Sequence, residues 1–229
     1  PDVHISFKGF KPQIIFVKNI LSVGIPSIIM SSVGSAMTFG MNKILITFSS
    51  TAVAVFGVYF KLNSFVFMPV FGLNNGMVPI VSYNYGAQNK KRLTKTIKLA
   101  IMYAVCIMFI GIMLFQFIPD VLLRLFDASD HMLEIGIPAL RVISLSFAFA
   151  GICIVISSSL QALGHGFLSM MISITRQLII LLPSAYILAK FGGIHAVWWS
   201  FNIAEIASLT LSLLFFKHMY NKIIKHLGE

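Results

Sequence analysis

Residues His195–Phe216 read HAVWWSFNIAEIASLTLSLLFF. This stretch is apolar and long enough to cross a bilayer, because a transmembrane helix needs about 20 such residues. Glu205 lies deep within it, and a carboxylate in hydrocarbon is costly. Helices that carry such a residue usually turn it toward a polar cavity or a partner. The stretch therefore predicts a membrane helix, with a transport pathway as the default hypothesis for Glu205.

The composition extends this prediction to the whole chain. Hydrophobic residues make up 58% and charged residues 10%, against about 25% charged residues in an average soluble domain. The mean hydropathy is +0.91. Long apolar runs recur along the chain, and each can span about 30 Å of hydrocarbon. We predict an all-α membrane protein with six transmembrane helices at 20–41, 53–83, 97–118, 135–162, 168–189 and 195–216.

These spans divide the chain into an N-terminal segment (1–18), a six-helix bundle (19–217) and a basic tail (218–229). The N-terminal segment mixes basic and aromatic residues, so it either lies on the membrane surface or serves as a linker. It lacks the apolar core of a signal peptide. Since the chain opens at Pro1 without an initiator Met, we expect it to be a fragment of a longer protein.

The net charge of +10 has a topological explanation. Eleven Lys and Arg residues fall on one side of the predicted bundle: Lys8, Lys11, Lys18, Lys90, Lys91, Arg92, Lys95, Lys98, Lys217, Lys222 and Lys225. Two, Arg124 and Lys190, fall in loops on the other side. Basic residues concentrate in cytoplasmic loops. We therefore predict both termini in the cytoplasm, a multi-pass protein of the plasma membrane (the inner membrane of a bacterium) and no nucleic-acid partner.

Three predicted helices carry polar stripes. Spacing at 100° per residue collects the following residues: on the last helix Trp198, Asn202 and Glu205; on the second Lys61, Met68, Asn75 and Pro79; on the fifth Arg176 and Gln177. The three charged residues fall at similar depth, where unpaired charges are costly. We expect a shared polar centre, with Glu205 near Lys61 or Arg176. Met68, Asn75, Asn202, Gln177 and Trp198 are the candidates to line a cavity there.

Two main interpretations of this centre remain open, beside local snorkelling of the long charged side chains toward the membrane surface. The charges form either an ion pair that holds helices together or part of a water-filled pathway used by a coupling ion and a substrate. The two are not exclusive. Replacing Glu205 by Gln separates them, because loss of transport with normal protein levels indicates a pathway, whereas loss of folded protein indicates a structural pair.

The second span is longer than a membrane requires and contains Pro69 and Pro79. A proline inside a helix removes a backbone donor and clashes with the preceding turn, so we predict a kink there. Cys106 and Cys153 lie within spans, as is typical of packing residues. The chain contains no HExxH, GxSxG or Walker A motif. We therefore predict no enzymatic activity, no metal and no cofactor, and either an ion gradient or a partner as the energy source.

Three stretches resemble the multidrug and toxin extrusion (MATE) family. They are FMPVFGLNNGMVPIVSYNYGAQN at 67–89, QALGHG at 161–166 and VWWSFNIAE at 197–205. Their order and the six spans are similar to the C-terminal six-helix lobe of that family. Two residues depart from the family pattern. Asn202 stands where Pro is expected, which argues against a kink in the last helix, and Asn75 stands where Gln is common.

The resemblance implies a parent protein with twelve helices in two lobes around a central cavity, so that an N-terminal lobe is missing here. It implies an antiporter that exports small organic, mostly cationic, drugs or metabolites in exchange for H⁺ or Na⁺ by alternating access. Two alternatives stay open. One is a flippase for lipid-linked oligosaccharides with the same fold, which Arg176 and Lys61 favour. The other is a six-helix membrane partner protein that does not transport.

Overall fold

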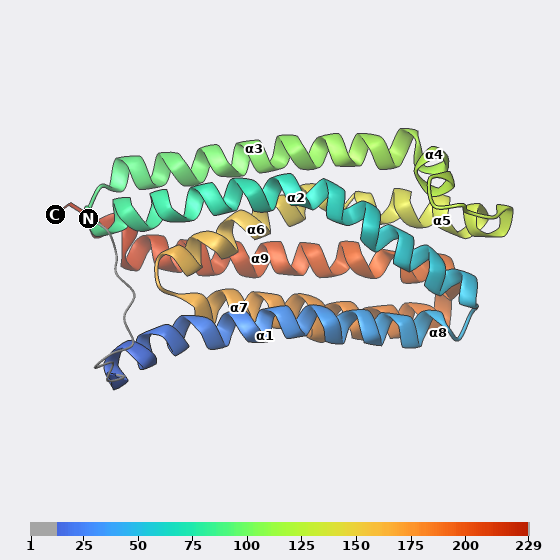
Figure 1. Ribbon diagram of the computed structural model, residues 1–229, viewed down its shortest axis with the longest axis horizontal. Coiled ribbons are helices and arrows are strands. Elements are labelled where there is room, and N and C mark those ends of the chain that lie inside the picture. The colour runs from blue at the N-terminus through green and yellow to red at the C-terminus, as the bar shows by residue number, and fades with distance from the viewer. Residues whose placement is uncertain (1–12, 229) are drawn as a thin grey trace, which may run out of the picture.

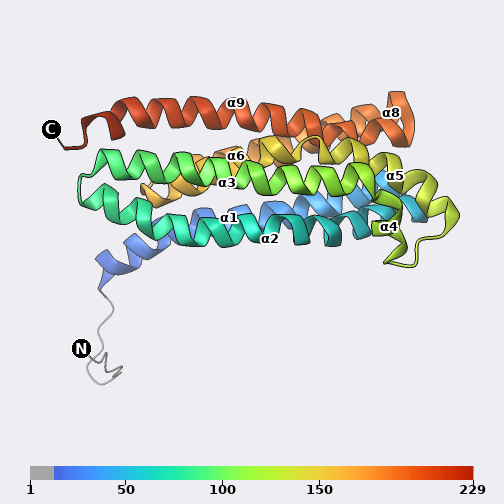
Figure 2. The ribbon, with the colours of Figure 1, turned by 90° about the horizontal axis from the view of Figure 1, so that it is seen from above.

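The computed structural model describes residues 13–228 as a bundle of long helices that run side by side (Figures 1 and 2). The helices are α1 (Ile14–Leu45), α2 (Ser50–Gly86), α3 (Lys90–Phe117), α4 (Pro119–Arg124), α5 (Asp130–Ser144), α6 (Phe147–Ala162), α7 (Gly166–Ile174), the π-helical segment η1 (Thr175–Leu181), α8 (Leu182–Val197), α9 (Trp199–Lys222) and the short 3₁₀ helix η2 (Ile224–His226). The first residues of the predicted N-terminal segment lie outside this range, and its last residues already belong to α1.

The prediction of an all-α membrane protein with six spans is confirmed. Five helical segments of the described chain are long and apolar enough to cross a bilayer, and α5 with α6 makes a sixth span. Side-chain caps begin several helices, since the oxygens of Ser49, Asn89 and Ser129 accept backbone N–H groups in the first turns of α2, α3 and α5. The start of α1 and the end of α9 lie at the same end of the bundle (Figure 1).

The fourth span, predicted as one helix at 135–162, consists of two helices that meet at 50°. The break falls between Ser144 and Phe147, and α5 continues through Pro138 without interruption. The hydroxyl of Ser144 donates to the Arg141 carbonyl (3.0 Å), and that of Ser146 donates to the Ile143 carbonyl (2.7 Å). Serine hydroxyls that bond nearby carbonyls compete with the helix ladder. The bend therefore follows the serines and not the proline.

The last two spans also differ from their predicted bounds. Helical backbone continues from Gly166 to a kink at Gly193, a few residues past the expected end at 189. Residues 194–197 are helical again, and α9 begins at Trp199. The reversal of direction occurs at Gly193, whose φ of 67° and ψ of −168° are non-helical. Side chains are rarely tolerated at such positive φ. A Cβ on the neighbouring Gly192 would collide with Ala196, so both glycines allow this tight turn.

Helix α2 continues through Pro69 and Pro79. Figure 1 shows that this helix changes direction near its middle. A bend of this kind agrees with the predicted kink, because a proline leaves the carbonyl four residues earlier without its donor. The bend brings the first half of α2 against α5, while its second half packs against α3 and α6.

The core of the bundle is apolar and aromatic. Trp198, Phe56, Phe115 and Phe147 are almost fully buried, and the ring centroids of Phe115 and Phe147 lie 5.2 Å apart, edge to face. Many large apolar side chains remain on the outside, including Ile14 at 84%, Phe65 at 71% and Phe191 at 80% exposure. Exposed apolar surface of this extent marks a membrane or protein interface.

Candidate functional site

A partly buried ion pair joins Arg176 and Glu205. Arg176 Nη1 donates to Glu205 Oε1 over 2.8 Å, and the side chains are 24% and 13% exposed. The prediction that Glu205 meets one of the deep cations is therefore confirmed for Arg176. The other acidic residues of the described range are exposed, so Glu205 is the one carboxylate within this part of the bundle. Its second oxygen, Oε2, is buried and accepts no hydrogen bond from any residue between 13 and 228.

Arg176 sits on a π-helical segment, Thr175–Leu181. Pro183 follows at the start of α8. A proline has no N–H for the Ile179 carbonyl and its ring would clash with that carbonyl in an α-helix, so the wider π turn relieves both problems. The Ser184 hydroxyl donates to the Ile180 carbonyl (2.6 Å) and satisfies part of the loosened ladder. Single π turns are frequent at functional sites, and here the turn carries the cation of the pair.

Further polar groups surround the ion pair. Tyr59 from α2 is buried and lies within electrostatic reach of both Glu205 and Arg176. Cys153 from α6 is also buried near both charges, and its thiol faces the hydroxyls of Ser208 and Ser212 on α9. Four separate segments therefore contribute to one polar interior. The charge pair and a free carboxylate oxygen there could bind water or a cation.

Asn202 connects α9 to the broken span. Its Nδ2 donates to the Val142 carbonyl over 2.8 Å. In an unbroken helix this carbonyl would accept from Ser146 N, but Ser146 N bonds to Ile143 O instead. On the opposite side, Gln116 Nε2 of α3 donates to the Arg141 carbonyl over 2.8 Å. Asn202 therefore acts as a bridge that satisfies backbone freed by the break, which differs from the cavity-lining role predicted for it.

Gln177 and Trp198 lie in the packed interior. The amide oxygen of Gln177 lies against α1, where a Cβ on Gly34 would be 3.7 Å away. Trp198 has no exposed surface, and its buried indole nitrogen has no hydrogen-bond partner within the part of the chain that the structure describes. Both residues are part of the helix packing near the site. Within this lobe Trp198 is a core residue, in contrast to the predicted cavity lining.

The structure separates Lys61 from the ion pair, so the expected convergence of three charges is wrong. Lys61 is exposed, and its Nζ lies 5.6 Å from the ring centroid of Phe126 in a cation–π contact. Met68 and Asn75 are exposed on the same helix. They face away from the bundle interior and stay candidates for a cavity that this surface would share with another lobe.

Two site residues were missed. Asn74 is 5% exposed and both of its amide atoms lack partners, whereas the predicted Asn75 is on the surface. Tyr59 was missed as a neighbour of the ion pair. Polar residues occur on more than one face of α2, so its sequence does not identify the face that turns inward. Burial of the flanking Val70, Met77 and Val81 now shows that Asn74 shares the inner face.

The fold and the site together define a class of protein. Six spans surround a buried charge pair, one span is broken, and the span that carries Arg176 contains a π turn. Broken helices and ionisable residues within a membrane are typical of transporters.

Comparison with protein families agrees. Residues 26–187 match the MatE family model, and the chain therefore belongs to the MATE family. Because this is a family of transporters, the assignment supports the prediction that the protein is not an enzyme. The multidrug export protein MepA of Staphylococcus haemolyticus is 27% identical over 94% of this chain and 47% of its own length. MepA of Staphylococcus aureus strain MSSA476 is 30% identical over 89% of this chain and 45% of its own length.

Solved structures show the same fold. An outward-facing multidrug resistance MATE transporter superposes with a TM-score of 0.89 at 24% identity, over 97% of this chain and 51% of that one. A transporter of the MOP superfamily from Pyrococcus furiosus, for which a binding pocket of reverse polarity suggests a different function, gives a TM-score of 0.87 at 24% identity, over 99% of this chain and 51% of that one. The chain spans about half the length of the relatives it matches.

Proposed function

We propose that this chain forms one lobe of a secondary active exporter, which moves small organic cations out of the cell in exchange for H⁺ or Na⁺. Membership of the MATE family and the similarity to the MepA multidrug export proteins support export as the activity. A second six-helix lobe completes the transporter in this proposal, and the matched fraction of the relatives, about half, supports it. Alternating access then arises from the two lobes moving around a central cavity.

The ion pair between Arg176 and Glu205 is the observation that carries the coupling part of the proposal. Arg176 supplies the one positive charge that the Glu205 carboxylate needs, at 2.8 Å. An H⁺ or Na⁺ that binds Glu205 has to replace Arg176 as its partner, because two cations on one buried carboxylate leave an uncompensated charge. Cation binding and release of Arg176 are therefore linked. Release would allow α9 and the η1–α8 segment to move relative to each other.

The environment of the pair favours this exchange over a purely structural role. Glu205 Oε2 is buried and unpartnered. A carboxylate oxygen of a structural pair normally has hydrogen-bond partners, since an unsatisfied buried polar atom costs about 1–3 kcal/mol. The free oxygen provides a place for a proton or for a ligand of a bound cation. The π turn under Arg176 adds a segment that is already loosened.

The two alternative functions have less support. A flippase for lipid-linked oligosaccharides would need cations free to bind a diphosphate. Arg176 is neutralised by Glu205, and Lys61 lies over the ring of Phe126. A partner protein without transport activity would require none of the buried polar groups around Glu205, each of which destabilises an inert helix bundle. The exporter accounts for more of the observed residues.

Reconstitution of the intact protein in proteoliposomes tests the proposal. A fluorescent organic cation is followed while a pH gradient or a Na⁺ gradient is imposed separately. We expect transport in the presence of one gradient, and its collapse when nigericin or monensin, respectively, dissipates that gradient. Transport of the organic cation that does not respond to either gradient would overturn the proposal. So would the absence of transport for every organic cation tested, combined with movement of a lipid-linked sugar.

A further inference from the structure

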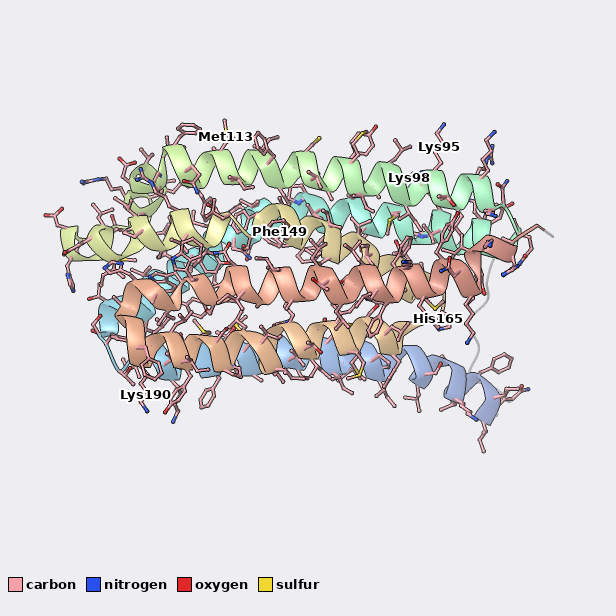
Figure 3. All side chains as sticks on the ribbon, turned by 180° about the vertical axis from the view of Figure 1, so that it is seen from behind. Lys95, Lys98, Met113, Phe149, His165 and Lys190 are labelled. Atoms are coloured by element: carbon pink, nitrogen blue, oxygen red, sulfur yellow. The ribbon has the colours of Figure 1, made fainter. Side chains whose placement is uncertain are left out.

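The charge distribution predicts that the first turns of α3 lie on the cytoplasmic side of the membrane. This end of α3 carries an open groove of about 690 Å³, which is lined by residues between Lys90 and Met102. Figure 3 shows Lys95 and Lys98 projecting from this end of α3, at the end of the bundle opposite Lys190. We propose that this groove binds an anionic phospholipid, with the phosphate at the lysines and an acyl chain along the apolar residues below them. The inference does not depend on the proposed transport function.

The lysines form a single stripe. Lys91, Lys95 and Lys98 are spaced by four and three residues, which places them on one face of the helix. Like charges at this spacing repel one another and destabilise the helix. All three are exposed, so their ammonium groups are accessible from solvent. An anion that contacts all three removes the repulsion and is therefore favoured over three separate counterions.

No protein carboxylate of the described chain neutralises the stripe. The first turn of α3 contains no acidic residue. Asp120, Asp127, Asp130 and Glu134 belong to the α4–α5 region at the other end of the bundle (Figure 1), and Glu205 is paired with Arg176. The positive charge at the start of α3 thus stays uncompensated within residues 13–228. Its complement has to come from outside this part of the chain.

The remaining polar lining residues are already engaged. Lys90 Nζ donates to the Lys225 carbonyl over 2.7 Å and attaches the C-terminal segment to α3. The Thr94 hydroxyl donates to the Lys90 carbonyl over 2.8 Å. Lys91, Lys95 and Lys98 are therefore the groups available to a ligand, and they can be changed without removing the contact made by Lys90.

The groove becomes apolar toward the middle of the membrane, which distinguishes a lipid from a soluble anion. Leu99 and Met102 line its lower part and are 38% and 49% exposed. From Lys95 to Met102 the helix rises about 10 Å. A phospholipid at the membrane–water interface has the same arrangement, with its phosphate group followed by an acyl chain over a comparable length. The cytoplasmic leaflet is rich in anionic lipids that basic segments attract.

Native mass spectrometry of the intact protein, released from micelles that contain equal amounts of dioleoylphosphatidylglycerol and dioleoylphosphatidylcholine, tests the proposal. We expect preferential retention of phosphatidylglycerol. The triple variant Lys91→Gln, Lys95→Gln, Lys98→Gln should bind it about 100-fold more weakly, and each single variant about fivefold, because each basic side chain near an anionic headgroup contributes a similar attraction. Glycerol 3-phosphate, which has no acyl chains, should not bind.

The matched control is the triple variant Lys43→Gln, Arg124→Gln, Lys190→Gln, which removes the same charge from the opposite end of the bundle. It should retain phosphatidylglycerol as the unmodified protein does. Equal loss in both triple variants would show a general charge effect and overturn the site. Binding of glycerol 3-phosphate with equal affinity would assign the groove to a free phosphate instead. The single variants decide the matter if the triple variant does not fold.

Discussion

At the scale of single residues, the account depends on Glu205 and Arg176. Charges buried in a bundle are costly unless they are paired, and removal of one partner leaves the other uncompensated. The two side chains come from α9 and η1, which are joined by the 2.8 Å contact between them. The pair therefore ties two spans together while it leaves Glu205 Oε2 free. This combination suits a contact that is made in one state and broken in another.

A double-mutant cycle measures this contact. Arg176→Gln should lower the free energy of unfolding by about 3–5 kcal/mol, because Glu205 is then buried without its partner. The double variant Arg176→Gln, Glu205→Gln should be clearly more stable than the sum of the two single losses predicts, with a coupling of at least about 1 kcal/mol. Chemical unfolding in mixed micelles is the measurement, and strictly additive losses would contradict the pairing.

The sequence predicted that Glu205 meets a deep cation, Lys61 or Arg176, but not which of the two, and it did not predict all of the surroundings. Glu205 and Arg176 were identified because ionisable residues are rare inside a membrane span. Lys61 met the same criterion, yet its long side chain extends to Phe126 at the surface. Asn74 was missed because the residues three and four positions away on its helix face are apolar, whereas the neighbouring Asn75 falls on the face that carries Lys61 and Met68. Which face of an all-apolar helix turns inward depends on packing between helices, and a single sequence does not contain that information.

At the scale of elements, two irregular spans position the site. The π turn of η1 sets the register of Arg176 relative to α8, and the break between α5 and α6 is bridged by Asn202 of α9. Neither feature was predicted. The π turn depends on how the chain accommodates Pro183, and the break between Ser144 and Phe147 does not coincide with Pro138, the proline of that span. In both cases, hydrogen bonds from side-chain hydroxyls or amides replace backbone hydrogen bonds that the helix has lost. A hydropathy profile contains no information about such bonds.

Pro183→Ala tests the origin of the π turn. With a backbone N–H available for the Ile179 carbonyl, η1 should relax to an α-helix, and Arg176 should rotate away from Glu205 because the two helix types differ in residues per turn. A crystal structure of the variant should show the Arg176 Nη1 to Glu205 Oε1 distance beyond 3.5 Å, the usual limit of a hydrogen bond. A retained π turn with an intact pair would contradict this cause.

Asn202→Ala tests the bridge to the broken span. The Val142 carbonyl loses its donor at 2.8 Å, and an unsatisfied buried carbonyl costs about 1–3 kcal/mol. The free energy of unfolding should fall by that amount. Asn221→Ala, at an exposed position near the end of α9, serves as the control and should change it by less than about 0.5 kcal/mol. Equal effects of the two substitutions would argue against the bridge.

Gly193→Ala tests the reversal between α8 and α9. Gly193 has a φ of 67°, so a side chain there should destabilise the protein by about 1 kcal/mol or more. Gly57→Ala is the comparison, because its site in α2 is helical with open space around it, and alanine there should be neutral or stabilising by up to about 1 kcal/mol. Thermal unfolding of the two variants measures the difference in stability. If both substitutions changed the stability in the same direction, the reversal at Gly193 would be contradicted.

At the scale of the whole molecule, the six spans form a bundle whose outer surface exposes more large apolar side chains than the surface of a soluble monomer does. Composition and hydropathy were sufficient to predict this architecture, because length and apolarity of a span follow directly from bilayer thickness. Part of α2, with Met68 and Asn75, presents polar and flexible side chains on that outer surface. We infer that this part of the surface faces the second lobe and the substrate.

In the proposed exporter, the Glu205–Arg176 pair couples an ion gradient to export. The most direct test is gradient-driven transport of an organic cation by the intact protein in proteoliposomes, compared between the unmodified protein, Glu205→Gln and the control Glu134→Gln at an exposed site. The account predicts that Glu205→Gln folds but loses at least about tenfold in gradient-driven transport, as expected when an interaction of at least about 1.4 kcal/mol is lost, while Glu134→Gln is unaffected. Full gradient-driven transport by folded Glu205→Gln would contradict the account.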